Sequence, residues 1–186
     1  MLNSKSLIKI SAGLILVSTI GFSGKAHAQS ADVTLSGNAT NSCTLTSSAS
    51  GALVKSGALA AMEGSTGVSG FGVGNAGTAT VNCTNGGNLT VAAPVAVSAV
   101  PMGFAPAVLQ SVVQRGSGTS TNPADFTSAN TGGQFDTNAW NKPTTALSIP
   151  AGVSALNVAM VAGTPTAGPI PSGNYSYKVV LTVVTN

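Results

Sequence analysis

The sequence predicts an all-β protein with the architecture of a β-sandwich. Apolar residues alternate with polar ones at a period of two in several stretches, and Gly, Pro and Asn separate these stretches. About seven or eight short strands can be placed in this way, and helix signals are weak throughout. Many short strands joined by frequent turns are typical of two antiparallel sheets packed face to face.

The clearest strand is the last one, at residues 175–185. It follows a Pro-Ser-Gly-Asn turn and contains neither Gly nor Pro. One face of the pleated strand is polar apart from Val180 and Val184. We expect no further strand to follow it, so that it borders a place where a strand is missing. The other face carries only apolar and aromatic residues, namely Tyr175, Tyr177, Val179, Leu181 and Val183.

The first 28 residues have the pattern of a secretory signal peptide. Lys5 and Lys9 precede an apolar run at 10–22, and a small-x-small cleavage site follows at 26–28. The apolar run is too short to span a bilayer comfortably, and the rest of the chain has no second long one. We therefore expect a signal peptide at 1–28 and one exported domain at 29–186, with no membrane span in the mature chain.

Charge is sparse in the predicted mature chain. Residues 29–186 contain four basic and four acidic side chains, so their net charge is near zero. Nucleic-acid recognition needs a basic footprint, which this balance excludes. A near-neutral surface resists association poorly, which suits a protein that assembles.

Two cysteines lie in the apolar phase of their own predicted strands. Cys83 alternates with Ala79 and Val81 in the stretch 77–84, and the alternation resumes at Leu89 after a turn. Two cysteines in an exported chain are expected to pair, here between strands and against the core. Closing a loop of about 40 residues stabilises by about 4 kcal/mol. In the other stretch, 33–45, Asn41 alone interrupts a row of Val33, Leu35, Gly37, Ala39, Cys43 and Leu45.

The remainder of the chain is less regular. We expect short strands and loops at 47–75, one or two strands at 95–113, and strands at 146–149 and 153–161. The stretch 117–143 is the least regular. A Gly-rich segment at 70–77 opens no predicted helix, which favours a turn over a phosphate-binding loop.

Catalytic chemistry has little support in the sequence. The single histidine, His27, leaves with the signal peptide, so no nucleophile–histidine pair and no imidazole zinc site is expected. Asp125 and Asp136 could in principle form a glycosidase-like pair, and isolated acids in a solvated loop are the more ordinary interpretation. We expect no enzyme activity, no cofactor and no metal.

Three segments together resemble bacterial chaperone–usher pilins of the archaic type, which are related to spore coat protein U domains. They are VTLSGNATNSCTL at 33–45, GTATVNCTNGGNLTV at 77–91 and GPIPSGNYSYKVVLTVVTN at 168–186, of which the last is the most specific. The resemblance implies an incomplete immunoglobulin-like sandwich that lacks its last strand.

The same resemblance implies partners and a location. A periplasmic chaperone fills the open groove first, and the amino-terminal extension of the next subunit replaces it at an outer-membrane usher. The implied function is that of a secreted structural subunit of a fimbria, or pilus, or of a surface coat. Such a subunit passes through the periplasm to the cell surface and pairs with copies of itself or with neighbouring pilins by donor-strand complementation.

The predicted amino-terminal extension is short. Residues 29–35 reach about 23 Å when extended, so a full donor strand has to include part of the stretch 33–45. Either the donor segment runs from 31 to 39, or the protein does not polymerise as a pilin does. We favour the first alternative, in which the residues that face the groove are Val33, Leu35, Gly37 and Ala39.

A self-contained secreted binding module is the competing hypothesis. Trp140 lies among Asn138, Asn141 and Lys142 in the irregular stretch 117–143 and could stack on a carbohydrate. The alternative is that this aromatic residue anchors the loop onto the sandwich.

Overall fold

The computed structural model describes residues 40–56, 59–68, 73–116, 118–135, 140–164 and 166–186. The chain divides into Met1–Asn38 and Ala39–Asn186. The predicted signal peptide and the candidate donor residues Val33, Leu35, Gly37 and Ala39 lie outside the described residues.

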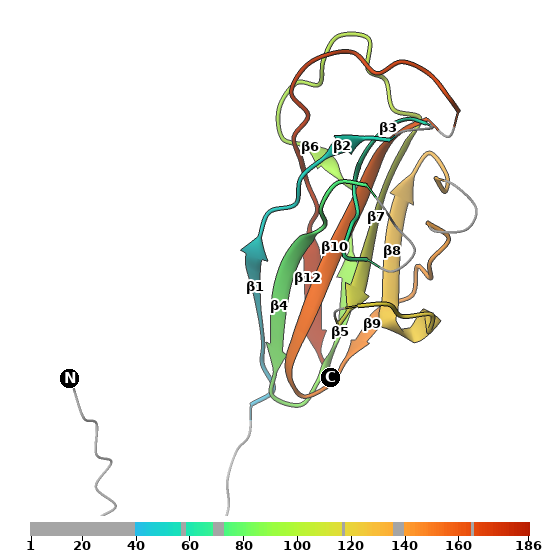
Figure 1. Ribbon diagram of the computed structural model, residues 1–186. Coiled ribbons are helices and arrows are strands. Elements are labelled where there is room, and N and C mark those ends of the chain that lie inside the picture. The colour runs from blue at the N-terminus through green and yellow to red at the C-terminus, as the bar shows by residue number, and fades with distance from the viewer. Residues whose placement is uncertain (1–39, 57–58, 69–72, 117, 136–139, 165) are drawn as a thin grey trace, which may run out of the picture. The chain divides into compact units, whose positions relative to one another are not determined.

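The protein is all-β, and its larger sheet is built around one long strand, β10 (Gly152–Thr164). All the strand pairs in this seven-stranded sheet are antiparallel (Figure 1). One edge of β10 pairs with β7, and its other edge pairs first with β4 and then with β3. The remaining members are β1 (Cys43–Ala49), β2 (Val54–Lys55), β3 (Ala60–Gly64), β4 (Gly77–Cys83), β7 (Val108–Arg115) and β8 (Phe126–Thr131).

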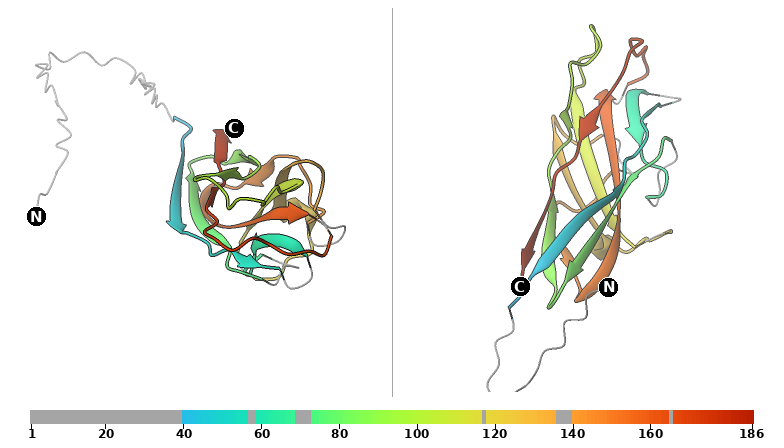
Figure 2. Two further views of the ribbon diagram at one scale, coloured as in Figure 1. Left: turned by 90° about the horizontal axis from the view of Figure 1, so that it is seen from above. Right: turned by 90° about the vertical axis from the view of Figure 1, so that its left-hand side faces the viewer.

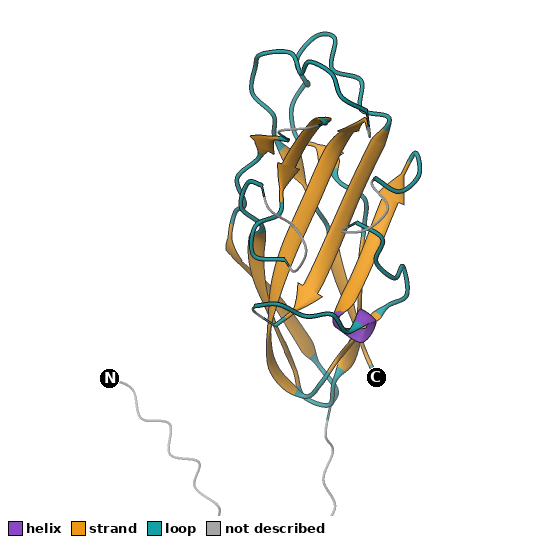
Figure 3. Cartoon of the chain, turned by 45° about the vertical axis from the view of Figure 1, so that its right-hand side comes forward, coloured by secondary structure: helices purple, strands orange, loops and turns teal. Residues whose placement is uncertain are grey.

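The second layer is smaller. Its three strands are ordered β12 (Leu181–Thr185), β5 (Gly87–Val91) and β9 (Leu147–Ile149). A short pair, β6 (Val95–Ala96) with β11 (Tyr177–Lys178), continues the β5–β12 ladder toward the other end of the molecule. In the described chain the helical content is one 3-10 turn at Pro123–Asp125, which Figure 3 shows beside the strands.

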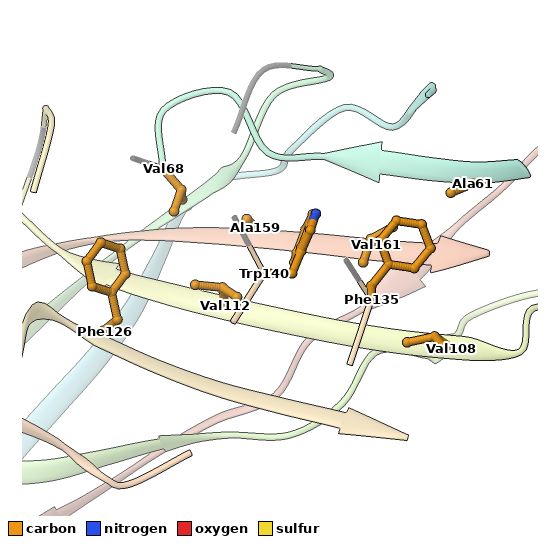
Figure 4. Close-up of a cluster of buried hydrophobic side chains, with 9 residues drawn as sticks. All are labelled: Ala61, Val68, Val108, Val112, Phe126, Phe135, Trp140, Ala159 and Val161. Carbon is orange, nitrogen blue, oxygen red and sulfur yellow. The ribbon is translucent and has the colours of Figure 1, made fainter. Parts of the chain in front are cut away.

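Apolar side chains bury both faces of the larger sheet. Between the layers, Leu156 packs with Val81 and Leu89 in one cluster, and Met160 packs with Phe104 in another. On the opposite face, Ala159 and Val161 of β10 belong to a third cluster, here called the outer cluster, which includes the loop residues Phe135 and Trp140 (Figure 4). β10 is therefore buried on both sides from Ala159 to Gly163.

One side of the two-layer arrangement is closed by hydrogen bonds. The Thr127 hydroxyl of β8 donates to the carbonyl oxygen of Thr145 at 2.8 Å, and the Arg115 guanidinium donates to that of Ser148 at 2.5 Å. These bonds join the β7–β8 edge of the larger sheet to the chain around β9.

Several predicted strands are confirmed. β4 matches the stretch 77–84, with Ala79, Val81 and Cys83 buried, and β9 and β10 match 146–149 and 153–161. The stretch 117–143, for which no strand was placed, contains β8. β8 shows no apolar alternation, because the consecutive residues Thr127 and Ser128, on opposite faces of the strand, are both buried and both polar.

The early and final strands also differ from expectation. Of the stretch 33–45, residues 40–42 are not strand, and β1 begins at Cys43 and runs on to Ala49. The final strand begins at Tyr177 rather than at Tyr175, and it is interrupted at Val179–Val180 between β11 and β12. The facing chain at residues 92–94 is interrupted as well, where Pro94 has no N–H to donate to a ladder.

No helix in the described residues is both long enough and apolar enough to cross a bilayer.

Candidate functional site

A groove of about 560 Å³ lies between the free edges of the two layers. Its walls are β1 and the final segment, residues 175–181. Among the described residues, β1 pairs only with β4, and β12 pairs only with β5. Both strands therefore turn an unpaired backbone edge toward the same opening. The right-hand view of Figure 2 looks onto this side, with β1 and β12 facing the viewer.

The final segment presents its apolar face to the groove. Its odd-numbered residues are half-buried and its even-numbered residues are exposed, as the sequence alternation predicts. Val180 and Val184, the two exceptions on the polar face, are 48% and 62% exposed. Members of this face that line the groove are Tyr175, Tyr177, Val179 and Leu181.

The opposite wall and the floor come from the larger sheet. Leu45, Ser47 and Ala49 of β1 line the wall, and all three are at least partly exposed. The floor includes Val158 and Met160 of β10 together with glycines that carry no side chain, namely Gly51, Gly64 and Gly77. Apolar core residues therefore remain within reach of solvent along the opening.

The disulfide closes one end of this groove, here called the disulfide end. Cys43 and Cys83 are direct cross-strand partners, and the predicted bond between them is present. The Cys43 sulfur lies 3.7 Å from the Gly86 carbonyl oxygen of the second layer. A Cβ atom on Gly87 would lie 3.0 Å from this sulfur and 2.7 Å from the Val184 carbonyl oxygen, so glycine is required for this close approach.

The other end, here called the loop end, is held by aromatic residues. The Tyr175 ring packs edge-on against Phe104 with a centroid separation of 4.9 Å, and its hydroxyl donates to the Pro171 carbonyl oxygen at 2.6 Å. The Tyr177 hydroxyl is buried and has no hydrogen-bond partner in the described chain. Desolvation raises the pKa of both tyrosines, and the nearby Tyr175 raises that of Tyr177 further.

The core under the groove is unevenly covered. The cluster at the loop end has three buried members and eight partly buried ones. The cluster at the disulfide end has eight buried members and six partly buried ones. The core beside the groove is therefore least buried at the loop end.

The side chain of Trp140 is not accessible to a ligand. Trp140 is 3% exposed, and its ring meets the Phe135 ring edge-on at 6.3 Å. Carbohydrate stacking on Trp140 is therefore contradicted, and the prediction that this residue anchors the loop is confirmed. Lys142, near the same loop, places its Nζ atom 4.5 Å from the centroid of Phe126, and burial lowers its pKa.

The acidic residues do not form a described catalytic pair. Asp125 forms an ion pair with Arg115 at 2.8 Å and accepts a hydrogen bond from the Ser120 hydroxyl at 2.7 Å. The Ser120 bond and then the Arg115 bond hold the pKa of Asp125 below its ordinary value. Asp136 lies outside the described residues, and no cluster of three potential metal ligands occurs within them.

The sequence analysis missed the larger-sheet wall of the groove. Ser47 and Ala49 extend β1 beyond its predicted end, and neither is among the residue types enriched in strands. The Gly-rich segment at 70–77 is only partly described. Within it, Gly74 has φ +63° in the turn next to the bridged residue Asn75, in keeping with the expected turn.

Comparison with protein-family models, with curated proteins and with solved structures finds no match to this chain.

Proposed function

We propose that the protein is a secreted structural subunit that assembles into a fimbria or a surface coat by accepting a strand from a neighbouring molecule. The observation that carries the proposal is the groove between β1 and the final segment. It has an apolar floor, and an unpaired strand edge lies on each side of it. A strand inserted there satisfies the backbone groups of both edges and covers the half-buried core.

The donor is the segment 31–39 of the next copy. It supplies alternate apolar positions in the period that a groove of this kind requires, at Val33, Leu35, Gly37 and Ala39. In this proposal the sandwich is an immunoglobulin-like fold short of one strand. A periplasmic chaperone covers the groove before assembly and an outer-membrane usher exchanges the strands, after export directed by residues 1–28.

Two neighbouring residues give a matched test. Val179 faces the groove and is half-buried, whereas Val180 is 48% exposed on the opposite face. Val179→Asp places a charge under the inserted strand and should abolish fibres seen by electron microscopy. Val180→Asp should form fibres of normal length.

Mixing experiments separate the donor from the groove. A chain in which residues 29–35 are deleted keeps its groove, and the Val179→Asp chain keeps its donor segment. Neither should polymerise alone, and their mixture should stop at a heterodimer in size-exclusion chromatography. Fibres of normal length from the deleted chain would refute polymerisation by strand donation.

A further inference from the structure

The two ends of the groove differ, and the difference bears on how far an inserted strand can extend. At the loop end the floor is formed in part by glycines, and the core is poorly covered. At the disulfide end the Cys43 sulfur packs on Gly86 and Gly87 of the second layer. The Asn41 side chain there also donates to the carbonyl oxygen of Asn186, 2.5 Å away, beyond the end of β12.

Toward the disulfide end, the residues that line the groove stop at the same level on both walls. On β1 it reaches Leu45, one inward position before Cys43. On the final segment it reaches Leu181, one inward position before Val183. Cys43 and Val183 both pack in the well-buried cluster that includes Cys83. An inserted side chain has open volume beside Leu181, but beside Val183 it meets the disulfide and its packing partners.

We infer that the Cys43–Cys83 disulfide is the end stop of the groove and limits the inserted strand to four inward-facing side chains. This inference depends on the proposed function. It adds to that function the register of the inserted strand relative to residues 175–181. The four positions lie opposite Tyr175, Tyr177, Val179 and Leu181. The segment 31–39 of a second copy has one apolar residue for each of them, and these are Val33, Leu35, Gly37 and Ala39.

The register can be tested without knowing the direction of the inserted strand. When the four inward residues face 175–181, the outward residue at their centre is Ser36, and it lies opposite Lys178 in either direction. Paired residues on neighbouring strands are close enough for a disulfide, whereas a shift of two residues adds about 7 Å along the strand. Lys178, Val180 and Thr182 are all exposed, so substitutions there leave the core intact.

The experiment uses full-length chains that carry Ser36→Cys with one second cysteine, assembled into fibres and then mildly oxidised. Ser36→Cys with Lys178→Cys should give a ladder of linked chains on a non-reducing gel, at least tenfold stronger than the ladder with Val180→Cys or Thr182→Cys. Val54→Cys, exposed on β2 and outside the groove lining, is the control for random linkage.

The outcomes are distinct. Fibres in which Ser36→Cys links to Val180→Cys or Thr182→Cys show that the strand slides past the disulfide end, which overturns the end stop and leaves strand donation standing. Fibres that give no linkage with any of the three positions overturn it too. Failure of all the variants and of the unmodified chain to form fibres removes the proposed function itself.

Discussion

The buried Gln110 side chain holds Trp140 through a single main-chain contact. Its Nε2 atom donates to the Trp140 carbonyl oxygen at 2.7 Å, and its Oε1 atom accepts from the Phe135 N–H at 2.8 Å. Gln110 is fully buried, on the face of β7 that the loop covers. One amide thus joins the two ends of this loop and supplies the acceptor for the buried Phe135 N–H.

Gln110→Ala should therefore destabilise the protein strongly. Loss of the amide leaves the buried Phe135 N–H without a partner and removes one of the two hydrogen bonds to the Trp140 carbonyl oxygen, which also accepts from the Lys142 N–H at 2.9 Å. An unsatisfied buried donor costs about 1–3 kcal/mol. Urea unfolding measures this difference. Gln134→Ala is the matched control, since Gln134 is exposed and its hydrogen bond to Asn141 is at the surface. Its effect should stay within about 0.5 kcal/mol.

Trp140→Ala should lower the free energy of unfolding by about 3–5 kcal/mol, because a large buried side chain is removed from the outer cluster. Thermal unfolding followed by circular dichroism tests this. Val153→Ala, at a position 71% exposed, should leave the midpoint almost unchanged. Wild-type stability in the Trp140→Ala protein would contradict the anchoring role.

Loss of the disulfide should destabilise the fold by about 4 kcal/mol through the entropy of the unfolded chain. The bond joins residues 40 apart and ties the edge strand β1 to β4. Comparing urea midpoints of the wild type and the Cys43→Ala/Cys83→Ala variant gives the value. Equal midpoints would mean that β1 is held without the covalent link.

Acid should weaken the contribution of Asp125. Its folded pKa is depressed by the Ser120 and Arg115 bonds, so the stabilisation is complete above the unfolded pKa of about 3.9 and is lost as the pH falls through the lower folded value. The melting temperature of wild type should exceed that of Asp125→Asn at pH 7, and the gap should shrink by pH 3. A gap that is constant between these pH values would exclude the linkage.

Most of the interlayer core could be predicted from the sequence. Ala79, Val81 and Cys83 alternate strictly because β4 has one apolar face, and the final segment alternates for the same reason. The outer cluster could not be predicted in this way. Phe135 and Trp140 reach the sheet from a loop, and a loop has no periodicity to show which of its residues are buried.

The groove was predictable on one side only. Tyr175 to Leu181 form a wall whose pattern is visible in the sequence, whereas the opposite wall depends on how β1 pairs with β4. The packing of Cys43 against Gly87 is likewise a long-range contact between the layers, and local sequence carries no signal for it.

Hydrogen bonds from Thr127 and Arg115 to the chain around β9 close one side of the described sandwich. The groove between β1 and the final segment lies open on another side. If each molecule accepts a strand in that groove and donates one segment in turn, every subunit has one acceptor groove and one donor segment. Filaments of this protein should then be unbranched. A single subunit whose groove or donor segment is blocked should stop growth at the filament end that it occupies.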